Sequence, residues 1–168
     1  MTIINIFSEN TNTNIDIDEK KYLTLAKKIF KFYMKQDFFK DSSVFGFDYK
    51  TVSFDILYCN NEKTHEINRE YRHKDYVADI ITFSIFADSD EKFIFDNEIN
   101  LGEFIISLDK VLEKSDGSKK SFEYELSFLI AHGIMHLLGF DHQTQEDYNF
   151  VVEQQNKALE SLGIIKDE

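Results

Sequence analysis

The chain lacks most of the features that mark a secreted or membrane protein. Cys59 is the single cysteine, so an internal disulfide is excluded. No apolar run approaches the roughly 18 residues that a helix needs to cross a bilayer, and the first ten residues, MTIINIFSEN, have neither a basic start nor a long apolar stretch. Proline and tryptophan are absent, and their absence excludes no function. We therefore expect a cytoplasmic protein with no membrane span and no disulfide partner.

Basic side chains are also scarce. Nineteen Lys and Arg residues stand against thirty-one Asp and Glu residues, which gives a net charge of −12. Because contact with phosphates needs Lys or Arg to displace counterions, this balance argues against indiscriminate nucleic-acid binding. One segment nevertheless concentrates lysines between apolar residues, and it is expected to form either a solvated helix face or a surface that binds a nucleic-acid backbone. These lysines are Lys20, Lys21, Lys27, Lys28, Lys31 and Lys35.

Length and hydrophobic content predict one domain that covers residues 1–168. With 168 residues, of which 42% are hydrophobic, the chain can bury one core and is too short for two. Short apolar or alternating segments predict strands at residues 2–7, 51–58, 79–86 and 102–108, and the acidic stretch 87–100 is expected to be a loop. The predicted fold class is α+β, with a small mixed β-sheet of about four strands packed with about five helices.

Helix signals are clearest in four places. Asp18, and then Asn60 or Asn61, precede apolar residues at helical spacing and can cap the first two helices. Ser121, with acidic residues behind it, is expected to open a third helix, which carries histidines. Thr144 begins a capping-box pattern before the last helix.

The most informative segment, residues 131–142, reads AHGIMHLLGFDH and has the spacing H-x-x-x-H-x-x-G-x-x-H. On a helix, His132 and His136 leave the same face, so both imidazoles can reach one ion. Gly139 can adopt the left-handed conformation that ends a helix, and the chain then turns back so that His142 can approach the same point. The spacing predicts a site with three imidazole ligands.

Three neutral nitrogen donors suit zinc, and we expect one zinc ion per chain. A structural zinc site normally has four protein ligands, whereas a catalytic site keeps a position for water or substrate. No cysteine is near enough in the sequence to close the site. A bound zinc lowers the pKa of its water to about 7, so hydrolysis is the expected reaction class. Paired histidines on a helix also occur without a metal, but the third histidine and the glycine favour a metal site.

The same spacing occurs in the metzincin peptidases, with an informative difference. Those enzymes place a glutamate directly after the first histidine, and here that position is Gly133, so the usual general base is absent. Their methionine turn is absent as well, because the methionines are Met1, Met34 and Met135. Gly133 lies in the apolar stripe of its helix, which suggests close packing against another element. A zinc peptidase is therefore the second interpretation.

Four segments resemble the YbeY family of bacterial rRNA-maturation endoribonucleases. The strongest is ELSFLIAHGIMHLLGFDH, residues 125–142, which is similar to the family signature H-G-x-x-H-L-x-G-Y-D-H. INREYR at 67–72 resembles N-x-x-Y-R, ADIITFS at 78–84 resembles T-D-V-L-S-F-P, and LGEFIIS at 101–107 resembles L-G-D-I-V-I-S. Order and spacing agree for all four segments, although Phe140 stands where tyrosine is usual, and Ala78, Thr82, Ser84 and Glu103 also depart from the pattern.

The resemblance implies a zincin-like helix with His132, His136 and His142 as zinc ligands, and Arg72 as a catalytically important residue in the cleft. It also implies a single-strand-specific endoribonuclease that acts in 16S rRNA 3′ end maturation and ribosome quality control. The implied partners are single-stranded ribosomal RNA, the small ribosomal subunit and its assembly proteins. Because Ala78 replaces the usual threonine, no role is carried over for that hydroxyl.

Chemistry gives independent support for an arginine in this role. RNA cleavage needs a cation to hold the scissile phosphate, and the planar fork of arginine fits phosphate best. Arg69 and Arg72 are the two arginines of the chain, and Arg69 is expected to lie at a solvated helix end. Asp141 could orient an imidazole or be solvated, and Glu125 is more suited to a capping or supporting role than to proton transfer. Either the metal-activated water itself or a group such as Asp79 would then handle the proton.

Three functions remain open from the sequence: an endoribonuclease, a zinc peptidase, and a metal-stabilised ribosome-associated module without catalysis. Gly133 weighs against the peptidase. The open coordination position expected for a three-histidine zinc site weighs against a purely structural role. The endoribonuclease is the leading hypothesis.

Overall fold

The computed structural model describes residues 1–166, and its strands form one mixed sheet with the order β1-β2-β4-β3. Strand β1 (Ile3–Asn10) runs parallel to β2 (Thr51–Cys59), and β2 runs parallel to β4 (Glu98–Ser107). Strand β3 (Ile80–Phe83) pairs antiparallel with β4 at the far edge. The predicted α+β class and the four-stranded mixed sheet are confirmed.

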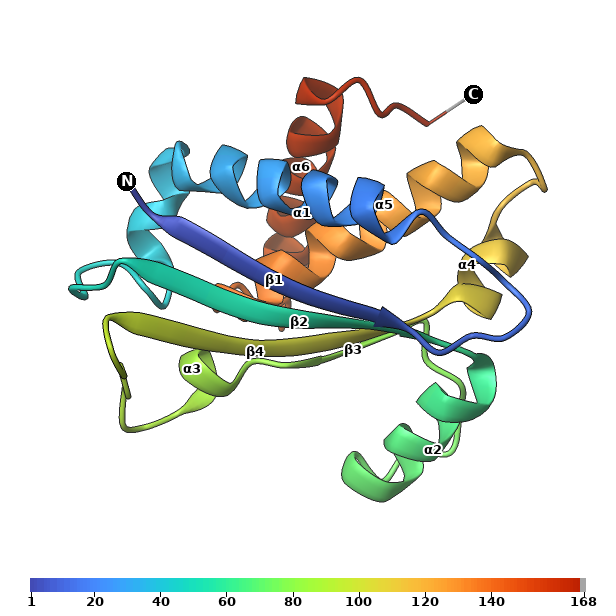
Figure 1. Ribbon diagram of the computed structural model, residues 1–168, viewed down its shortest axis with the longest axis horizontal. Helices are drawn as coiled ribbons and strands as arrows, with labels where there is room; N and C mark the ends of the chain where they lie inside the picture. The colour runs from blue at the N-terminus through green and yellow to red at the C-terminus, as the bar shows by residue number, and fades with distance from the viewer. Residues whose placement is uncertain (167–168) are drawn as a thin grey trace.

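The helices lie unevenly on the two faces of the sheet (Figure 1). Three long helices, α1, α5 and α6, cover one face, while α2 lies on the other side. Two shorter helices, α3 and α4, flank β4 in sequence, and a 3-10 helix follows α1. Their bounds are α1 Glu19–Met34, Asp37–Asp41 for the 3-10 helix, α2 Asn61–Tyr71, α3 Ile85–Asp88, α4 Leu108–Lys114, α5 Lys119–Leu137 and α6 Gln145–Ser161.

The main core fills the space between the sheet and the three long helices. Phe30 of α1 stacks on Phe54 of β2 at 6.1 Å between ring centroids, and Phe54 stacks on Phe104 of β4 at 5.9 Å. Tyr33 is fully buried beside them, and its hydroxyl donates a hydrogen bond to the carbonyl of Ala131 on α5. This bond and the aromatic stack fix the depth at which α5 lies on the sheet.

Three of the predicted helix caps are confirmed. The side chains of Asp18, Asn60 and Thr144 accept hydrogen bonds from the backbone amides three residues later, at the starts of α1, α2 and α6. The prediction for α5 was wrong, because Ser118 rather than Ser121 caps that helix. The hydroxyl of Ser118 accepts the amide hydrogen of Ser121, which makes Ser121 the third helical residue.

Two other boundaries also differ from the prediction. Strand β4 begins at Glu98, inside the stretch expected to be a loop, and β3 ends at Phe83, before the expected end of its segment. At Gly102, φ is +121°, and a Cβ there would lie 2.0 Å from the carbonyl oxygen of Phe83. Pairing between β3 and β4 stops at this close approach, and the chain leaves the sheet to form α3. Helix α4 was not predicted at all.

The second face of the sheet carries a smaller apolar cluster. Cys59, Ile67, Ala78, Ile81 and Ile105 form it beneath α2. Burial raises the pKa of the Cys59 thiol to about 12, and this cysteine is free. No helix within residues 1–166 is long and apolar enough to span a membrane.

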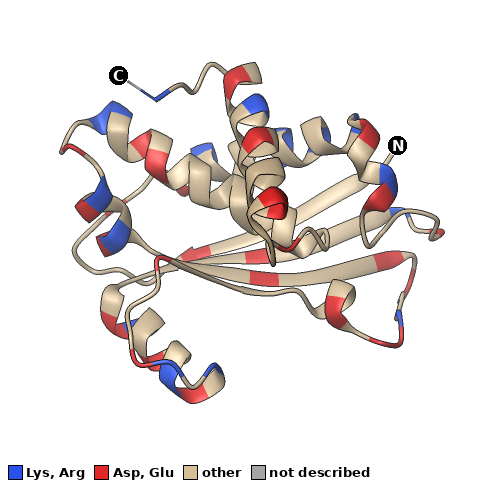
Figure 2. Cartoon of the chain, turned by 180° about the vertical axis from the view of Figure 1, so that it is seen from behind, with Lys and Arg blue, Asp and Glu red and all other residues tan. Residues whose placement is uncertain are grey.

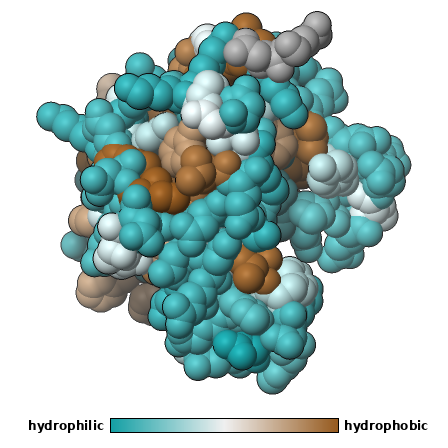
Figure 3. Space-filling view, turned by 90° about the vertical axis from the view of Figure 1, so that its right-hand side faces the viewer, coloured by the Kyte–Doolittle hydropathy of each residue, from teal (hydrophilic) through white to brown (hydrophobic). Residues whose placement is uncertain are grey.

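Charged residues of both signs are interspersed on the helices, whereas those within the strands are acidic (Figure 2). On the side that carries α4, the surface is mostly hydrophilic, with apolar side chains confined to separate patches (Figure 3). In Figure 2 the basic residues of the described chain stand among acidic ones, as expected for a net charge of −12. Contacts with an anionic ligand must therefore come from local groups of cations.

Candidate metal centre and active-site cleft

Three histidines converge where α5 ends. His132 and His136 lie on successive turns of the helix, and Gly139 follows it with φ +94°. The amide of Gly139 donates to the carbonyl of His136 at 2.9 Å, and that of Phe140 donates to Met135 at 3.0 Å. These two bonds form the Schellman motif that reverses the chain. His142 is thereby brought back to the helix, as the spacing predicted.

The geometry of the histidines fits a single metal ion. The possible ligand atoms of His132, His136 and His142 all lie within 4.8 Å of one another. Their ring centroids are 4.6 to 5.3 Å apart. Nε2 of His136 is buried and has no hydrogen-bond partner among the described residues, which is the state expected of a nitrogen that binds a metal.

Burial favours the neutral form of two of these imidazoles, His132 and His136. Burial, aided by the neighbouring His132 and His142, lowers the pKa of His136 to about 4. Burial also lowers the pKa of His132. A neutral imidazole has the free lone pair that metal binding requires, so the donors are ready at neutral pH.

Two elements hold the site in place from outside α5. The hydroxyl of Ser84, which follows β3, donates to the carbonyl of His136 at 2.9 Å and ties the helix end to the edge of the sheet. From α6, the ring of Tyr148 meets the ring of His142 edge-on at 5.6 Å, and the amide of Gln155 contacts His132. The histidines are therefore supported on two sides.

The predicted packing role of Gly133 is confirmed. A Cβ at this position would lie 2.7 Å from ring atoms of the buried Phe104 on β4. Gly133 lets α5 approach the sheet, and a glutamate here would direct its carboxylate against an aromatic ring. The position that carries the general base in the metzincin peptidases thus faces the core of this protein.

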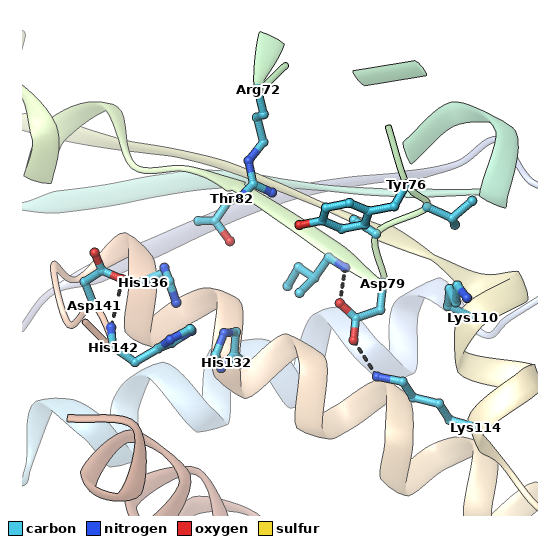
Figure 4. Close-up of a pocket in the computed structure, with 13 residues that line it drawn as sticks. Arg72, Tyr76, Asp79, Thr82, Lys110, Lys114, His132, His136, Asp141 and His142 are labelled. Carbon is cyan, nitrogen blue, oxygen red and sulfur yellow. Dashed lines mark hydrogen bonds and ion pairs between the residues drawn. The ribbon is translucent and has the colours of Figure 1, made fainter. Parts of the chain in front are cut away.

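The histidines form one wall of a cleft with a volume of about 510 Å³. Arg72, which caps the C-terminal end of α2, reaches into the cleft beside Thr82 of β3, across from His136 (Figure 4). Its guanidinium donates to the side-chain oxygen of Asn68 at 3.3 Å. Arg69 does not line the cleft and is exposed, as expected. The other lining residues are Tyr76, Val77, Ala78, Asp79, Ile80, Lys110, Lys114 and Asp141.

Two carboxylates line the cleft. Asp79 accepts the amide hydrogen of Ile80 at 2.7 Å and pairs with the ammonium group of Lys114 (Figure 4). Asp141 accepts the amide hydrogen of His142 at 2.8 Å. Partial burial alone would raise the pKa of Asp141, but hydrogen bonds to this carboxylate and the nearby histidines lower it overall. Asp141 thus helps to fix the segment that carries the third histidine. Glu125 does not line the cleft.

The wall formed by α4 was not predicted from the sequence. Lys110 and Lys114 project from this helix into the cleft, and Tyr76 lies between them and Arg72 (Figure 4). A signal for the helix exists in the sequence, because Ser107 precedes Leu108 and Val111, which are apolar and three residues apart. In the structure the Ser107 hydroxyl accepts the amide hydrogen of Lys110 as an N-cap.

The chain is similar in sequence to one family of known proteins. The family model described as Endoribonuclease YbeY matches residues 7–163. The Endoribonuclease YbeY of Malacoplasma penetrans is 34% identical over 152 residues, which cover 88% of this chain and 92% of the relative. That of Staphylococcus saprophyticus is 30% identical over 161 residues, with coverages of 96% and 97%.

A solved structure has a similar fold. A solution structure of a Thermotoga maritima protein shares the fold with a TM-score of 0.53 at 18% identity, and the match covers 96% of this chain and 92% of that one. The family model spans β2, β4 and β3, Arg72 and all three histidines. The chain therefore belongs to the YbeY family of endoribonucleases, and it is a metal-dependent hydrolase.

Proposed function

We propose that this protein is a zinc-dependent, single-strand-specific endoribonuclease that acts in the cytoplasm in 16S rRNA 3′ end maturation and ribosome quality control. Family membership supports the RNA substrate and the role in rRNA maturation. The observation that carries the proposal is the pairing of two features in one cleft: three converging histidines and an arginine that faces them.

His132, His136 and His142 would hold the metal ion. Three imidazoles match the donor preference of zinc and leave a coordination position free of protein ligands. Zinc bound there would supply Lewis-acid polarisation and make a bound water more acidic. Ser84 and Asp141 restrain the backbone around the second and third histidines through the hydrogen bonds described above, so the donors would need little rearrangement.

Arg72 is proposed as the catalytic cation. Its guanidinium presents several donors in a plane and can hold two oxygens of one phosphate. Because it reaches the cleft from α2, opposite the histidines, a phosphate between them would contact both sides. Charge that develops on the phosphoryl oxygens during cleavage would then be stabilised by a preorganised cation. Asn68, which is fully buried, accepts a hydrogen bond from Arg72 and steadies this orientation.

The remaining cleft residues suit a single strand. Tyr76 has half of its surface exposed and offers a ring on which an unpaired base can stack. Lys110 and Lys114 supply cations for neighbouring phosphates on the far wall. Asp79 and Asp141 are the carboxylates that line the cleft, so we propose that proton transfer involves one of them or the metal-activated water itself.

Cleavage assays with matched substrates test the proposal. The zinc-loaded protein is offered a 16S precursor RNA with a single-stranded 3′ extension, the same RNA with that extension annealed to a complement, and casein. We expect cleavage of the single-stranded extension alone. Equal cleavage of the annealed RNA would remove the strand specificity, and hydrolysis of casein without RNA cleavage would support the peptidase instead. Asp79→Asn and Asp141→Asn, compared over a range of pH, identify which carboxylate shapes the rate profile.

A further inference from the structure

Gln155 of α6 lies behind the histidine cluster with both ends of its amide engaged. The side chain is fully buried. Its Nε2 donates to the carbonyl oxygen of Phe128 on α5 at 3.1 Å, and its Oε1 lies 3.3 Å from Nδ1 of His132. A single residue thus joins the last helix to the helix that carries two of the histidines. Gln155 is part of none of the motifs described in the sequence, although it lies in the predicted last helix.

The hydrogen bond from Gln155 to Phe128 determines which end of the amide faces His132. A carbonyl oxygen can only accept, so Phe128 requires the NH₂ end of the Gln155 amide. The amide oxygen is then the end that faces His132, and it can only accept as well. Nδ1 of His132 must therefore carry the hydrogen. In a neutral imidazole the other nitrogen, Nε2, then holds the lone pair.

We propose that Gln155 is a positioning residue for the metal centre: it holds His132 as the Nδ1–H tautomer and directs its Nε2 lone pair to the metal. The inference rests on the proposed metal site and is independent of the RNA substrate. Ligating histidines commonly donate their second ring hydrogen to a neighbouring acceptor, and the loss of such a partner typically weakens metal affinity 10- to 100-fold. Gln155 is the acceptor that this structure provides for His132.

The choice of an amide in place of a carboxylate has a chemical consequence. A carboxylate partner would add negative charge next to the ligand and raise the basicity of the imidazole. Glutamine orients the ring and adds no charge, so a metal bound by the triad would keep its full Lewis acidity. The amide also supplies the donor that the Phe128 carbonyl uses, which a carboxylate cannot do unless it is protonated.

The tautomer can be measured without any substitution. In the metal-free protein with ¹⁵N-labelled histidine, long-range ¹H–¹⁵N spectra distinguish Nδ1–H from Nε2–H for each ring. We expect His132 to be Nδ1–H in the wild type. We expect a mixture of tautomers in Gln155→Leu, which has a similar size and lacks both amide functions. A wild-type His132 that is predominantly Nε2–H overturns the inference, whether or not the variant folds.

Zinc affinity, measured by competition with a chromophoric chelator, gives the second readout. We expect Gln155→Leu to bind zinc 10- to 100-fold more weakly than the wild type. Gln155→Glu, which keeps an acceptor toward His132, should recover most of that loss. The matched control is Gln154→Leu, since Gln154 is the adjacent buried residue of α6 and has no contact to the histidines among the described interactions. It should bind zinc as the wild type does.

The outcomes separate this inference from the proposed function. Unchanged zinc affinity and an unchanged His132 tautomer in folded Gln155→Leu would show that Gln155 only packs. An equal loss of affinity in Gln154→Leu would show the same, because the effect would then come from α6 as a whole. If the tautomer and affinity change as expected but the wild type cuts no RNA, the positioning role stands and the proposed function fails.

Discussion

The cleft and the outer face of α1 both gather nitrogen-bearing side chains, but their surroundings differ. In the cleft, the half-buried His132 and His136 and the exposed His142 face Arg72 across a concave surface. On α1, Lys28, Lys31 and Lys35 are exposed, and none of them lines the cleft. A concave surface lined by partly buried groups strengthens the interaction of a ligand with each charge, whereas charges outside such a cleft are screened by water and salt. The position of a cation therefore matters more than the number of cations in a segment.

Lysines of both regions form ion pairs. On α1, Lys21 pairs with Glu123 of α5 at 3.1 Å, which offsets part of the positive charge of that face. In the cleft, Lys110 pairs with Glu113 and Lys114 pairs with Asp79. All of these pairs are partly exposed and contribute little to stability, so a phosphate can compete for the lysines. Lys110 and Lys114 line the same cleft as Arg72 and the histidines, and the α1 lysines do not.

The largest effect is expected from the cleft histidines. His132→Ala combined with His136→Ala removes two of the three donors and should abolish both zinc binding and RNA cleavage. In the wild type, removal of the metal by a chelator should lower the Tm, because a ligand bound only by the folded state stabilises it. The double variant should show no such dependence. Elemental analysis that finds one full zinc per chain in the double variant would contradict the assignment.

Arg72→Ala should have the next largest effect. Loss of one preorganised electrostatic contact in a transition state typically costs about a hundredfold or more in rate. Zinc content and the Tm should stay at wild-type values, since Arg72 is exposed and lies outside the apolar core. The matched control is Arg69→Ala on the same helix, which should cut RNA normally. Equal rates for Arg72→Ala and the wild type would remove this arginine from the mechanism.

Acid should destabilise the metal-free protein through His136 and His132 of the cleft. An unfolded histidine titrates near pH 6.5, whereas His136 in the folded, metal-free protein titrates near 4, and the pKa of His132 is lowered as well. Between these values the unfolded chain binds more protons, so stability is full above about pH 6.5 and falls as the pH decreases. The Tm in chelator should therefore decline between about pH 7 and pH 5.

His136→Gln isolates this contribution from that of the carboxylates. The variant removes the group with the largest lowering of pKa among the histidines, so its Tm should decline less steeply over the same pH range. Parallel Tm curves for His136→Gln and the wild type would show that other groups account for the acid sensitivity.

A smaller effect is expected from the cleft lysines. For single-stranded nucleic acids, the logarithm of affinity falls with the logarithm of salt concentration by about 0.7 for each phosphate neutralised. Contacts from Arg72, Lys110 and Lys114 would give a slope of about 2, and Lys110→Gln with Lys114→Gln should reduce it by roughly 1.4. We expect the KM of this double variant to rise and its kcat to change little. A slope that stays near 2 in the double variant would place the RNA elsewhere.

Substitution of the lysines of the α1 segment should have the smallest effect. Lys27→Gln, Lys31→Gln and Lys35→Gln together should leave RNA affinity, its salt slope and zinc content unchanged, because these residues do not line the cleft. The same measurements on both sets of lysines decide between the two regions. If the α1 variant loses as much slope as the cleft variant, the RNA path extends over α1 and the contrast between the two regions disappears.

Much of the metal centre could be predicted from the sequence because its determinants are local. His132 and His136 are four residues apart, which places them on one helix face. Gly139 supplies the positive φ that reverses the chain, and His142 follows within three residues. The caps at Asp18, Asn60 and Thr144 depend on hydrogen bonds that span three residues. A pattern confined to one or two helical turns leaves the chain few alternatives.

The wall of the cleft that α4 forms depends on the tertiary structure. Lys114 meets Asp79 because β4 pairs with β3, and this pairing places α4 beside the start of β3. Sequence spacing cannot show this, because thirty-five residues separate the two side chains. The same pairing sets the end of β3 through Gly102, where the sequence pattern had suggested a longer strand.

The sequence by itself determined the spacing of the three histidines, the glycine that turns the chain, and the alternation of strands and helices. Tertiary structure decided what these residues face. Position 133 needs a glycine because Phe104 of β4 leaves no room for a Cβ. Gln155 reaches His132 because α6 packs across α5. The physical reason is the range of the interactions: helix periodicity and turn geometry act within a few residues, whereas packing and hydrogen bonding between elements depend on how the whole core closes.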